Sequence, residues 1–354
     1  MPKKNKILIW GPASSLSIPV AVALAKAGFE VHFVGKSFLN LMTPLNLKAG
    51  LKSTLKLNFL EQIKDENFNE CIKVIDSNSI NLNNNYAAVI FCGLPPHFDE
   101  AKLPRAPWSI DEFCKLANLF KQTPVYFISS IWSAIQEDDG TVLEDIGYNK
   151  RKPESAFEAV CQAYENELIK KNKFLNWYLI RIPLILGDSQ NGKTVNFTGL
   201  YSLIHQMLIL KNSHPGAVPH SVNGSLNINY NPHACLNWLP VDILSFLLVN
   251  YINDPIAPKI CNLVPTQALL NEEWINTLAK AVGFSKAIKS DYDNLAIAPT
   301  LRKLLNENIQ IKMRNLYEVI GRYKPNLSNL DETYFTNLIN YAEVKNWGNA
   351  SKDL

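Results

Sequence analysis

The clearest pattern of apolar and polar positions in the chain runs from residue 155 to residue 189. Between Phe157 and Ile169 apolar residues recur at helical spacing, and from Trp177 to Ile185 they form an almost continuous run. Such a run is typical of a strand that is covered on both faces, as in a parallel sheet. The pattern therefore predicts a helix followed by a buried strand, which is one step of an α/β fold.

The first 35 residues show a complete unit of strand, turn, helix and strand. The mostly apolar segments 6–10 and 30–34 are expected to be short strands, and the helical pattern of 18–27 ends at Gly28, a residue common after helix C-termini. Further strands are expected at 71–76, 87–92, 125–128 and 260–264. Strands that alternate with helices predict class α/β, with a doubly wound parallel sheet of the Rossmann type.

The chain divides into a sheet core and a smaller lobe. We expect the Rossmann core at 1–190 plus about 236–264, and a mostly helical C-terminal substrate lobe at 191–235 and 265–354. Expected helices of the lobe lie at 200–210, 270–282, 301–306, 311–320 and 333–344, and two further helices are expected within the core, near 59–63 and 108–120. The loop from 212 to 232 is rich in Gly, Pro and Asn, and long loops of this kind commonly line binding sites.

Composition narrows the class of protein. Hydrophobic residues make up 47% and charged residues 19%, as in globular domains, and a net charge of +3 argues against a nucleic-acid partner. No apolar run is long enough to span a membrane or to act as a signal peptide, which leads us to expect a cytoplasmic protein. The six cysteines are widely spaced, which indicates reduced thiols rather than a zinc site, and the histidines show no ligand spacing for any metal.

The turn after the first strand carries a degenerate phosphate-binding pattern. Gly11, Ser14 and Ser17 occupy the three glycine positions of G-x-x-G-x-x-G. The first glycine permits the tight turn, the second lets the backbone approach a pyrophosphate, and the third allows close helix packing. Serine is a small intrusion whose hydroxyl can donate to phosphate, while helix amides would face the anion. Both alternatives stay open here: a working dinucleotide site, or a site retained only as part of the fold.

The polar residues within 155–189 resemble the motifs of a known enzyme family. The segment is similar to Y-x-x-S-K-W-x-A-E and R-P-G-x-I-x-G-D-S-x-T-G of the thioester reductases, extended short-chain dehydrogenases/reductases that reduce acyl groups tethered to carrier proteins. Glu165 and Arg181 match, but Phe157 and Cys161 stand where the family has Tyr and Lys. Further matches are Ile185, Gly187, Asp188, Ser189, Gly192 and the segment 237–242, which resembles N-x-V-P-V-D and to which we assign a structural role.

The resemblance implies a catalytic group that this chain has partly lost. In the family the Tyr donates a proton to the carbonyl oxygen, and the Lys lowers its pKa and holds the nicotinamide ribose. Phe157 cannot donate, and the Cys161 thiol replaces an ammonium poorly. Ser129 and Ser130 match the hydroxyl residues that bond the substrate carbonyl. Tyr148 begins a Y-x-x-x-K whose Lys precedes a proline, so we favour a loop there, although Tyr148 is the first candidate for a replacement acid.

The resemblance also implies a cofactor. Lys36 follows the second strand, where NADP-dependent relatives place a cation for the ribose 2′-phosphate, so it favours NADP. The alternative is a solvated lysine on a loop. By the same resemblance Asp76 would approach the adenine, and we expect Gly93, at the end of the fourth strand, to border the same site.

Three functions remain open from the sequence. The leading hypothesis is an NADPH-dependent reductase of atypical mechanism, acting on an acyl thioester, aldehyde or imine in a biosynthetic pathway such as nonribosomal peptide or polyketide synthesis. Reduction of an iminium needs no proton donor in the hydride step, so a missing Tyr matters least there. The alternatives are a non-redox cyclase, isomerase or dehydratase, and a non-catalytic binding protein. The expected partner is a small-molecule or carrier-tethered substrate, and apolar helix faces are compatible with a homodimer.

Overall fold

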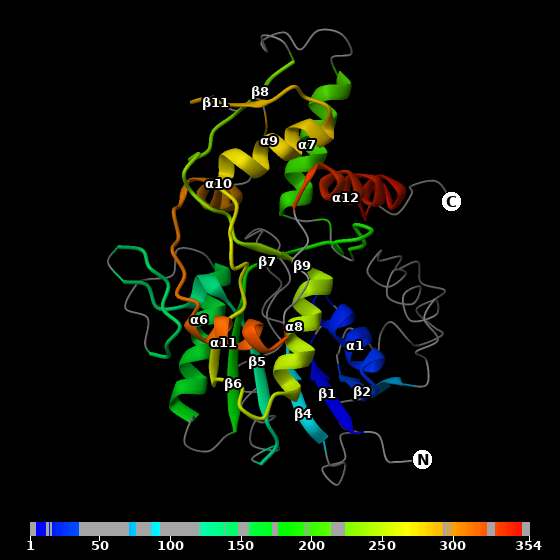
Figure 1. Ribbon diagram of the computed structural model, residues 1–354, viewed down its shortest axis with the longest axis vertical. Helices are drawn as coiled ribbons and strands as arrows, with labels where there is room; N and C mark the ends of the chain where they lie inside the picture. The colour runs from blue at the N-terminus through cyan, green and yellow to red at the C-terminus, as the bar shows by residue number, and fades with distance from the viewer. Residues whose placement is uncertain are drawn as a thin grey trace.

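Seven parallel strands form the main sheet of the protein in the computed structural model (Figure 1). Their order is β10-β6-β5-β4-β1-β2-β3, so the chain leaves β1 in one direction and returns to its other side at β4. This reversal of strand order makes the doubly wound sheet that the sequence predicts. The strands are β1 (Lys6–Trp10), β2 (Glu30–Val34), β3 (Ile72–Ile75), β4 (Tyr86–Phe91), β5 (Val125–Ser130), β6 (Trp177–Ile182) and β10 (Ile260–Asn262).

The structure describes most of the sheet core and most of the lobe. Its residues are 5–11, 14, 16–34, 71–75, 86–92, 120, 122–137, 139–147, 156–171, 176–194, 197, 199–213, 224–292, 295, 297, 299–323 and 330–348. The helices expected near 59–63 and 108–120 lie outside these residues, apart from position 120. The same holds for Lys36, Asp76, Gly93 and Tyr148.

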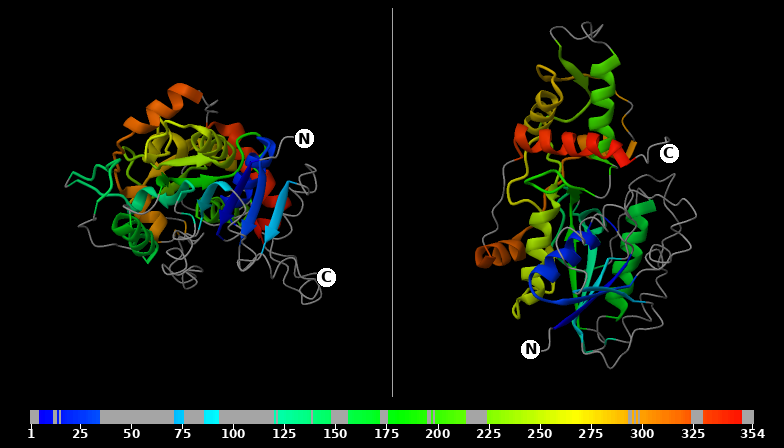
Figure 2. Two further views of the ribbon diagram at one scale, coloured as in Figure 1. Left: turned by 90° about the horizontal axis from the view of Figure 1, so that it is seen from below. Right: turned by 90° about the vertical axis from the view of Figure 1, so that its right-hand side faces the viewer.

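Helices cover both faces of the sheet, as Figure 2 shows. Helices α1 (Ser17–Lys26) and α8 (Val241–Asn253) pack against each other on one face, and α6 (Ala156–Lys171) covers the other. Along β5, Phe127 belongs to the apolar cluster that includes residues of α6, and Ile128 belongs to the cluster on the opposite face. Alternate residues of each strand are thus buried in different clusters, which explains why these strands are apolar throughout.

A proline divides the strand that the sequence predicts at 177–185. The structure has two strands there, β6 and the short β7 (Leu184–Leu186), with Pro183 between them. A proline has no N–H to donate to a neighbouring strand, so the ladder of β6 ends at this point. Strand β7 then pairs with β9 (Trp238–Pro240) in a separate small sheet that leads toward the lobe.

The lobe is built mainly from helices, with one small parallel sheet. The loop expected at 212–232 contains strand β8 (Leu226–Ile228), which pairs with β11 (Ala287–Lys289). These two strands of three residues each carry too little periodicity to be recognised in the polar segments of the sequence around them. The remaining elements are α7 (Leu200–Ser213), α9 (Asn271–Val282), α10 (Pro299–Asn306), α11 (Arg314–Tyr323), α12 (Glu332–Val344) and the 3-10 turns η4 (Ile131–Ser133) and η5 (Asn346–Gly348). The domain division stays a prediction, and α11 packs against β10 and α8 of the core.

The turn after β7 fastens the lobe to the core. The backbone amide and the hydroxyl of Ser189 both donate to the carboxylate of Asp242, at 2.9 and 2.6 Å. Tyr334 of α12 donates its hydroxyl to the Gly187 carbonyl at 3.0 Å. A Cβ on Gly192 would come within 2.3 Å of a backbone oxygen of α12, so only glycine permits this approach. The motif residues around 187–192 therefore hold two elements together.

Within the described ranges no helix combines the length and apolarity needed to cross a bilayer. The same residues contain no group of three or more His, Cys, Asp or Glu side chains arranged to hold a metal ion. Cys71, Cys92, Cys161, Cys235 and Cys261 are free thiols.

A cluster of polar side chains lies near the amino-terminal ends of strands β2, β3 and β4. Glu30 accepts a bond from Lys73 at 2.8 Å and contacts His32 Nε2 at 2.9 Å, while His32 Nδ1 lies 2.7 Å from the Tyr86 hydroxyl. The bond from Lys73, followed by that from His32, lowers the pKa of Glu30 from 4.5 to about 2. The carboxylate thus holds β2 and β3 together in its charged form.

Replacing this carboxylate should remove part of the acid sensitivity of the fold. Since the folded-state pKa lies below the unfolded value, Glu30 stabilises the protein above about pH 5 and loses that effect as the pH falls toward 2. Lys73 is largely exposed, so we expect Glu30→Gln to cost only about 1 kcal/mol at pH 7 and progressively less in acid. Urea titrations between pH 7 and 3 measure this. The exposed Glu318→Gln is the control, and an equal loss for Glu30→Gln at every pH would contradict the assignment.

Candidate functional site

The carboxyl end of β5 presents two hydroxyl groups to opposite faces of the sheet. Ser129 and Ser130 are the last residues of the strand, and successive side chains of a strand point to opposite sides. The Ser129 hydroxyl donates to Glu165 Oε1 of α6 at 2.5 Å. Ser130 caps the following turn η4, where its oxygen accepts from the Trp132 amide at 3.4 Å. The two predicted catalytic serines therefore have different environments.

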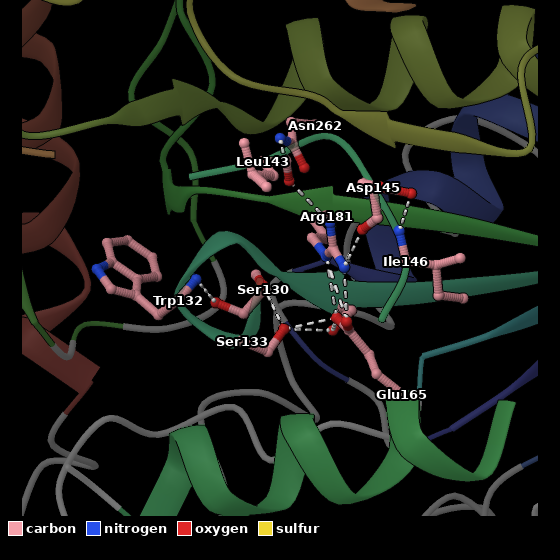
Figure 3. A network of polar contacts seen from close by, with 10 residues as sticks. Ser130, Trp132, Ser133, Leu143, Asp145, Ile146, Glu165, Arg181 and Asn262 are labelled. Atoms are coloured by element: carbon pink, nitrogen blue, oxygen red, sulfur yellow. Dashed lines mark hydrogen bonds and ion pairs between the residues drawn. The ribbon is translucent and has the colours of Figure 1, made fainter. Parts of the chain in front are cut away.

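The Glu165 carboxylate that accepts from Ser129 also forms a buried ion pair with Arg181, which Figure 3 shows. Arg181, in the middle of the apolar strand β6, is fully buried, and its Nη2 lies 2.8 Å from Glu165 Oε2. Nε of the same guanidinium lies 3.2 Å from Oε1. The Ser133 hydroxyl also reaches Oε1, at 2.6 Å. Charges away from water are tolerated when they are paired and hydrogen-bonded, and each nitrogen of this guanidinium donates at least one bond.

The guanidinium also holds the loop between η4 and α6. Its Nη1 donates to the Leu143 carbonyl at 3.2 Å and its Nη2 to the Asp145 carbonyl at 3.0 Å. The next carboxylate, Glu144, accepts from the backbone amides of Asn262 in β10 and Asn315 in α11, at 2.8 and 2.7 Å. Burial raises the pKa of Glu144, although these bonds oppose the rise. The loop is thereby fixed to three elements.

The sequence assigns Glu165 and Arg181 only to the family pattern, not to a role in the site. A charged residue within a continuous apolar strand needs a buried partner, so Arg181 itself is the signal that points to this ion pair. Ser133 carries no such signal, since its contact with Glu165 joins residues 32 positions apart.

Helix α6 carries Phe157 and Cys161, the positions at which the family has Tyr and Lys. The Cys161 thiol is completely buried. Its pKa is raised well above 9, first by burial and then by the nearby Glu165 and Glu158 carboxylates. The thiol is therefore neutral, and it is neither a cation nor a thiolate nucleophile. Position 157 lies in the first turn of α6, and its side chain is outside the described set.

The end of β1 meets the start of α1 at the centre of the sheet. A Cβ on Gly11 would lie 2.4 Å from the carbonyl oxygen of Cys92, at the end of β4, so this close approach requires glycine. Ser14 and Ser17 bond reciprocally: the Ser17 amide donates to Ser14 Oγ at 3.1 Å, and the Ser14 amide donates to Ser17 Oγ at 2.9 Å. These bonds resemble a capping box in the turn that leads into α1, while Leu16, the residue directly before the helix, makes no side-chain cap bond.

Comparison with known proteins shows similarity in structure. No protein-family model matches the chain, and a search of curated proteins found no match. Among solved structures, the terminal R domain from the myxalamid PKS-NRPS biosynthetic pathway is 14% identical, with a TM-score of 0.70 over 98% of this chain and 92% of that one. A thiolation-reductase di-domain from an archaeal non-ribosomal peptide synthetase is 11% identical, with a TM-score of 0.67 over 98% and 77% of the two chains.

A second group of similar structures consists of epimerases. A UDP-glucuronic acid 4-epimerase variant from Bacillus cereus, in complex with UDP-4-deoxy-4-fluoro-glucuronic acid and NAD, is 15% identical, with a TM-score of 0.63 over 96% of this chain and 99% of that one. Identities this low establish the fold alone. The chain has the α/β fold shared by these reductase domains and epimerases, and the predicted likeness to thioester reductases is confirmed at that level.

The described residues fit a dinucleotide at the junction of β1, β4 and α1. This junction is the point where strand order reverses, which is where open α/β sheets bind ligands. Gly11 leaves the strand end free of a side chain, and α1 begins directly above it. Ser14 stands where the dinucleotide-binding pattern has its second glycine, so a bound phosphate would have to displace the Ser14 side chain.

The two serines of β5 should differ in their effect on stability. Ser129→Ala removes a donor to a buried carboxylate, so we expect it to lower the free energy of unfolding by about 2 kcal/mol. Ser130→Ala removes only a long bond and should change it by less than about 0.5 kcal/mol. Chemical denaturation of both variants tests this contrast, with Ser130→Ala as the matched control. Equal losses would contradict the assigned environments.

Proposed function

We propose that the protein is a nicotinamide-dependent reductase of atypical mechanism, with an acyl thioester, aldehyde or imine as substrate and NADPH as cofactor. The main support is the match of its whole fold, sheet and lobe together, to reductase domains of biosynthetic pathways. The substrate would be a small molecule, or an acyl group carried by a carrier protein as in those pathways.

Residues at the end of β1 would hold the cofactor. Gly11 would admit the pyrophosphate, and the backbone at Ser14 and Ser17 would face it. Lys36 is proposed to bind the ribose 2′-phosphate and Asp76 to lie beside the adenine. Gly93, which follows β4 in the chain, is proposed to border the same cofactor site. When bound, the nicotinamide would supply the hydride.

Ser130 is the proposed contact with the electrophile. Ser129 is committed to Glu165, so its hydroxyl is already used inside the protein. The Ser130 proton has no acceptor among the residues that the structure describes, and its oxygen bonds only weakly with Trp132. A hydroxyl so placed can donate to a carbonyl oxygen and stabilise developing negative charge. Ser129 is then a positioning residue, since it acts through the ion pair.

Proton supply sets the substrate preference within this proposal. The neutral Cys161 thiol, with its raised pKa, is a poor acid, and position 157 is a phenylalanine. An iminium carbon accepts a hydride without simultaneous protonation, so a site of this kind suits an imine better than a ketone. Tyr148 is the proposed acid for substrates that do need a proton.

Binding and turnover can be tested in one set of proteins. We expect calorimetric titration to show tighter binding of NADPH than of NADH, and NADPH oxidation with a cyclic imine, an aldehyde or an acyl pantetheine thioester. Ser130→Ala should lower kcat by about a hundredfold, as loss of an oxyanion donor does. Ser129→Ala, assayed where it is folded, should keep kcat within a few fold. Unchanged turnover in Ser130→Ala, or no nucleotide binding at millimolar concentration, would refute the proposal.

A non-redox enzyme is the second candidate. The observation that favours it is the internal capping of the turn that would bind phosphate, together with the loss of the Tyr and Lys. Conversion of a candidate substrate by the purified protein without added NADPH or NADH would identify it as a non-redox enzyme.

A further inference from the structure

The backbone amides at the start of α1 are already hydrogen-bonded within the protein. Ser14 Oγ accepts from the Ser17 amide at 3.1 Å and from the Leu16 amide at 3.4 Å, and the Ser14 carbonyl accepts from the Ile18 amide at 3.3 Å. The next residue is Pro19, which has no amide hydrogen. Every position from 16 to 19 is thus either bonded to Ser14 or lacks a donor.

Those amides are the groups that a helix N-terminus offers to an anion. Unbonded N–H groups in the first turn are what makes such an end attractive to phosphate. Here a hydroxyl and a carbonyl of the same residue occupy them. The Ser14 hydroxyl is buried and lies 3.1 Å from the Ser17 hydroxyl, so the two side chains support each other.

We infer that the Ser14 hydroxyl competes with the phosphates of the proposed cofactor and thereby sets the affinity for nucleotide. The inference rests on the proposed function. For a pyrophosphate to reach the amides of residues 16 and 17, the Ser14 side chain must leave them, so binding costs the protein a helix cap. A serine cap contributes about as much as a fivefold to tenfold change in an equilibrium constant.

Removal of the hydroxyl should therefore strengthen binding. We expect Ser14→Gly and Ser14→Ala each to bind NADPH about fivefold more tightly than the unaltered protein in calorimetric titrations. In thermal unfolding without nucleotide both should melt lower, with alanine the worse cap. The alanine variant retains a Cβ and so separates the effect of the hydroxyl from that of space. The glycine variant keeps the test open if alanine fails to fold.

A helix cap elsewhere gives the matched control. Asp331 caps α12 through the Tyr334 amide at 2.9 Å, so Asp331→Ala should lower the melting temperature without changing NADPH affinity. A gain of affinity in this control would overturn the inference, as would no gain in Ser14→Gly, or a gain in Ser14→Gly with none in a folded Ser14→Ala. The proposed function is judged separately, because it requires the unaltered protein to bind. Binding by the Ser14 variants alone would support the inference and count against that function.

Discussion

The ion pair between Glu165 and Arg181 determines how the carboxyl end of the sheet is built. It joins α6 to β6, and through the remaining guanidinium donors it fixes the carbonyls of residues 143 and 145. Both charges are buried, so loss of one partner would leave the other without water or a counter-charge, at a cost of about 3–5 kcal/mol. The position of the β5 end, and hence of the candidate site, depends on this contact.

Both residues of this ion pair match the pattern of the thioester reductases, so the candidate site departs from that pattern at other groups. Polar groups that the resemblance assigns to ligands are here satisfied inside the protein: the Ser129 hydroxyl by Glu165, and the amides above Gly11 by Ser14. The Cys161 thiol, with its raised pKa, contributes no charge. The Ser130 oxygen accepts only one long bond, from the Trp132 amide, and Ser130 is the residue that we propose to contact the substrate.

Periodicity predicted most of the sheet because buried strands and amphipathic helices leave a repeating pattern in the sequence. It failed at Pro183, where one apolar run serves two sheets, and at the short strands β8, β9 and β11. The different environments of Ser129 and Ser130 depend on which face of the sheet each side chain occupies. Strand β5 is apolar on both faces, so its sequence does not show which serine lies on which face. Likewise, the partner of Arg181 lies 16 residues away in the chain and could not be chosen from composition. Contacts between residues distant in the chain therefore escaped prediction, in addition to these element boundaries.

The central claim is that a nicotinamide dinucleotide occupies the junction of β1, β4 and α1. Hydrogen–deuterium exchange with and without NADPH tests it most directly, because bound phosphates should slow exchange of nearby amides. The account predicts added protection in peptides from residues 6–34 and 86–92, with little change in the lobe helices α7 and α9. Protection confined to the lobe, or none at saturating NADPH, would contradict it.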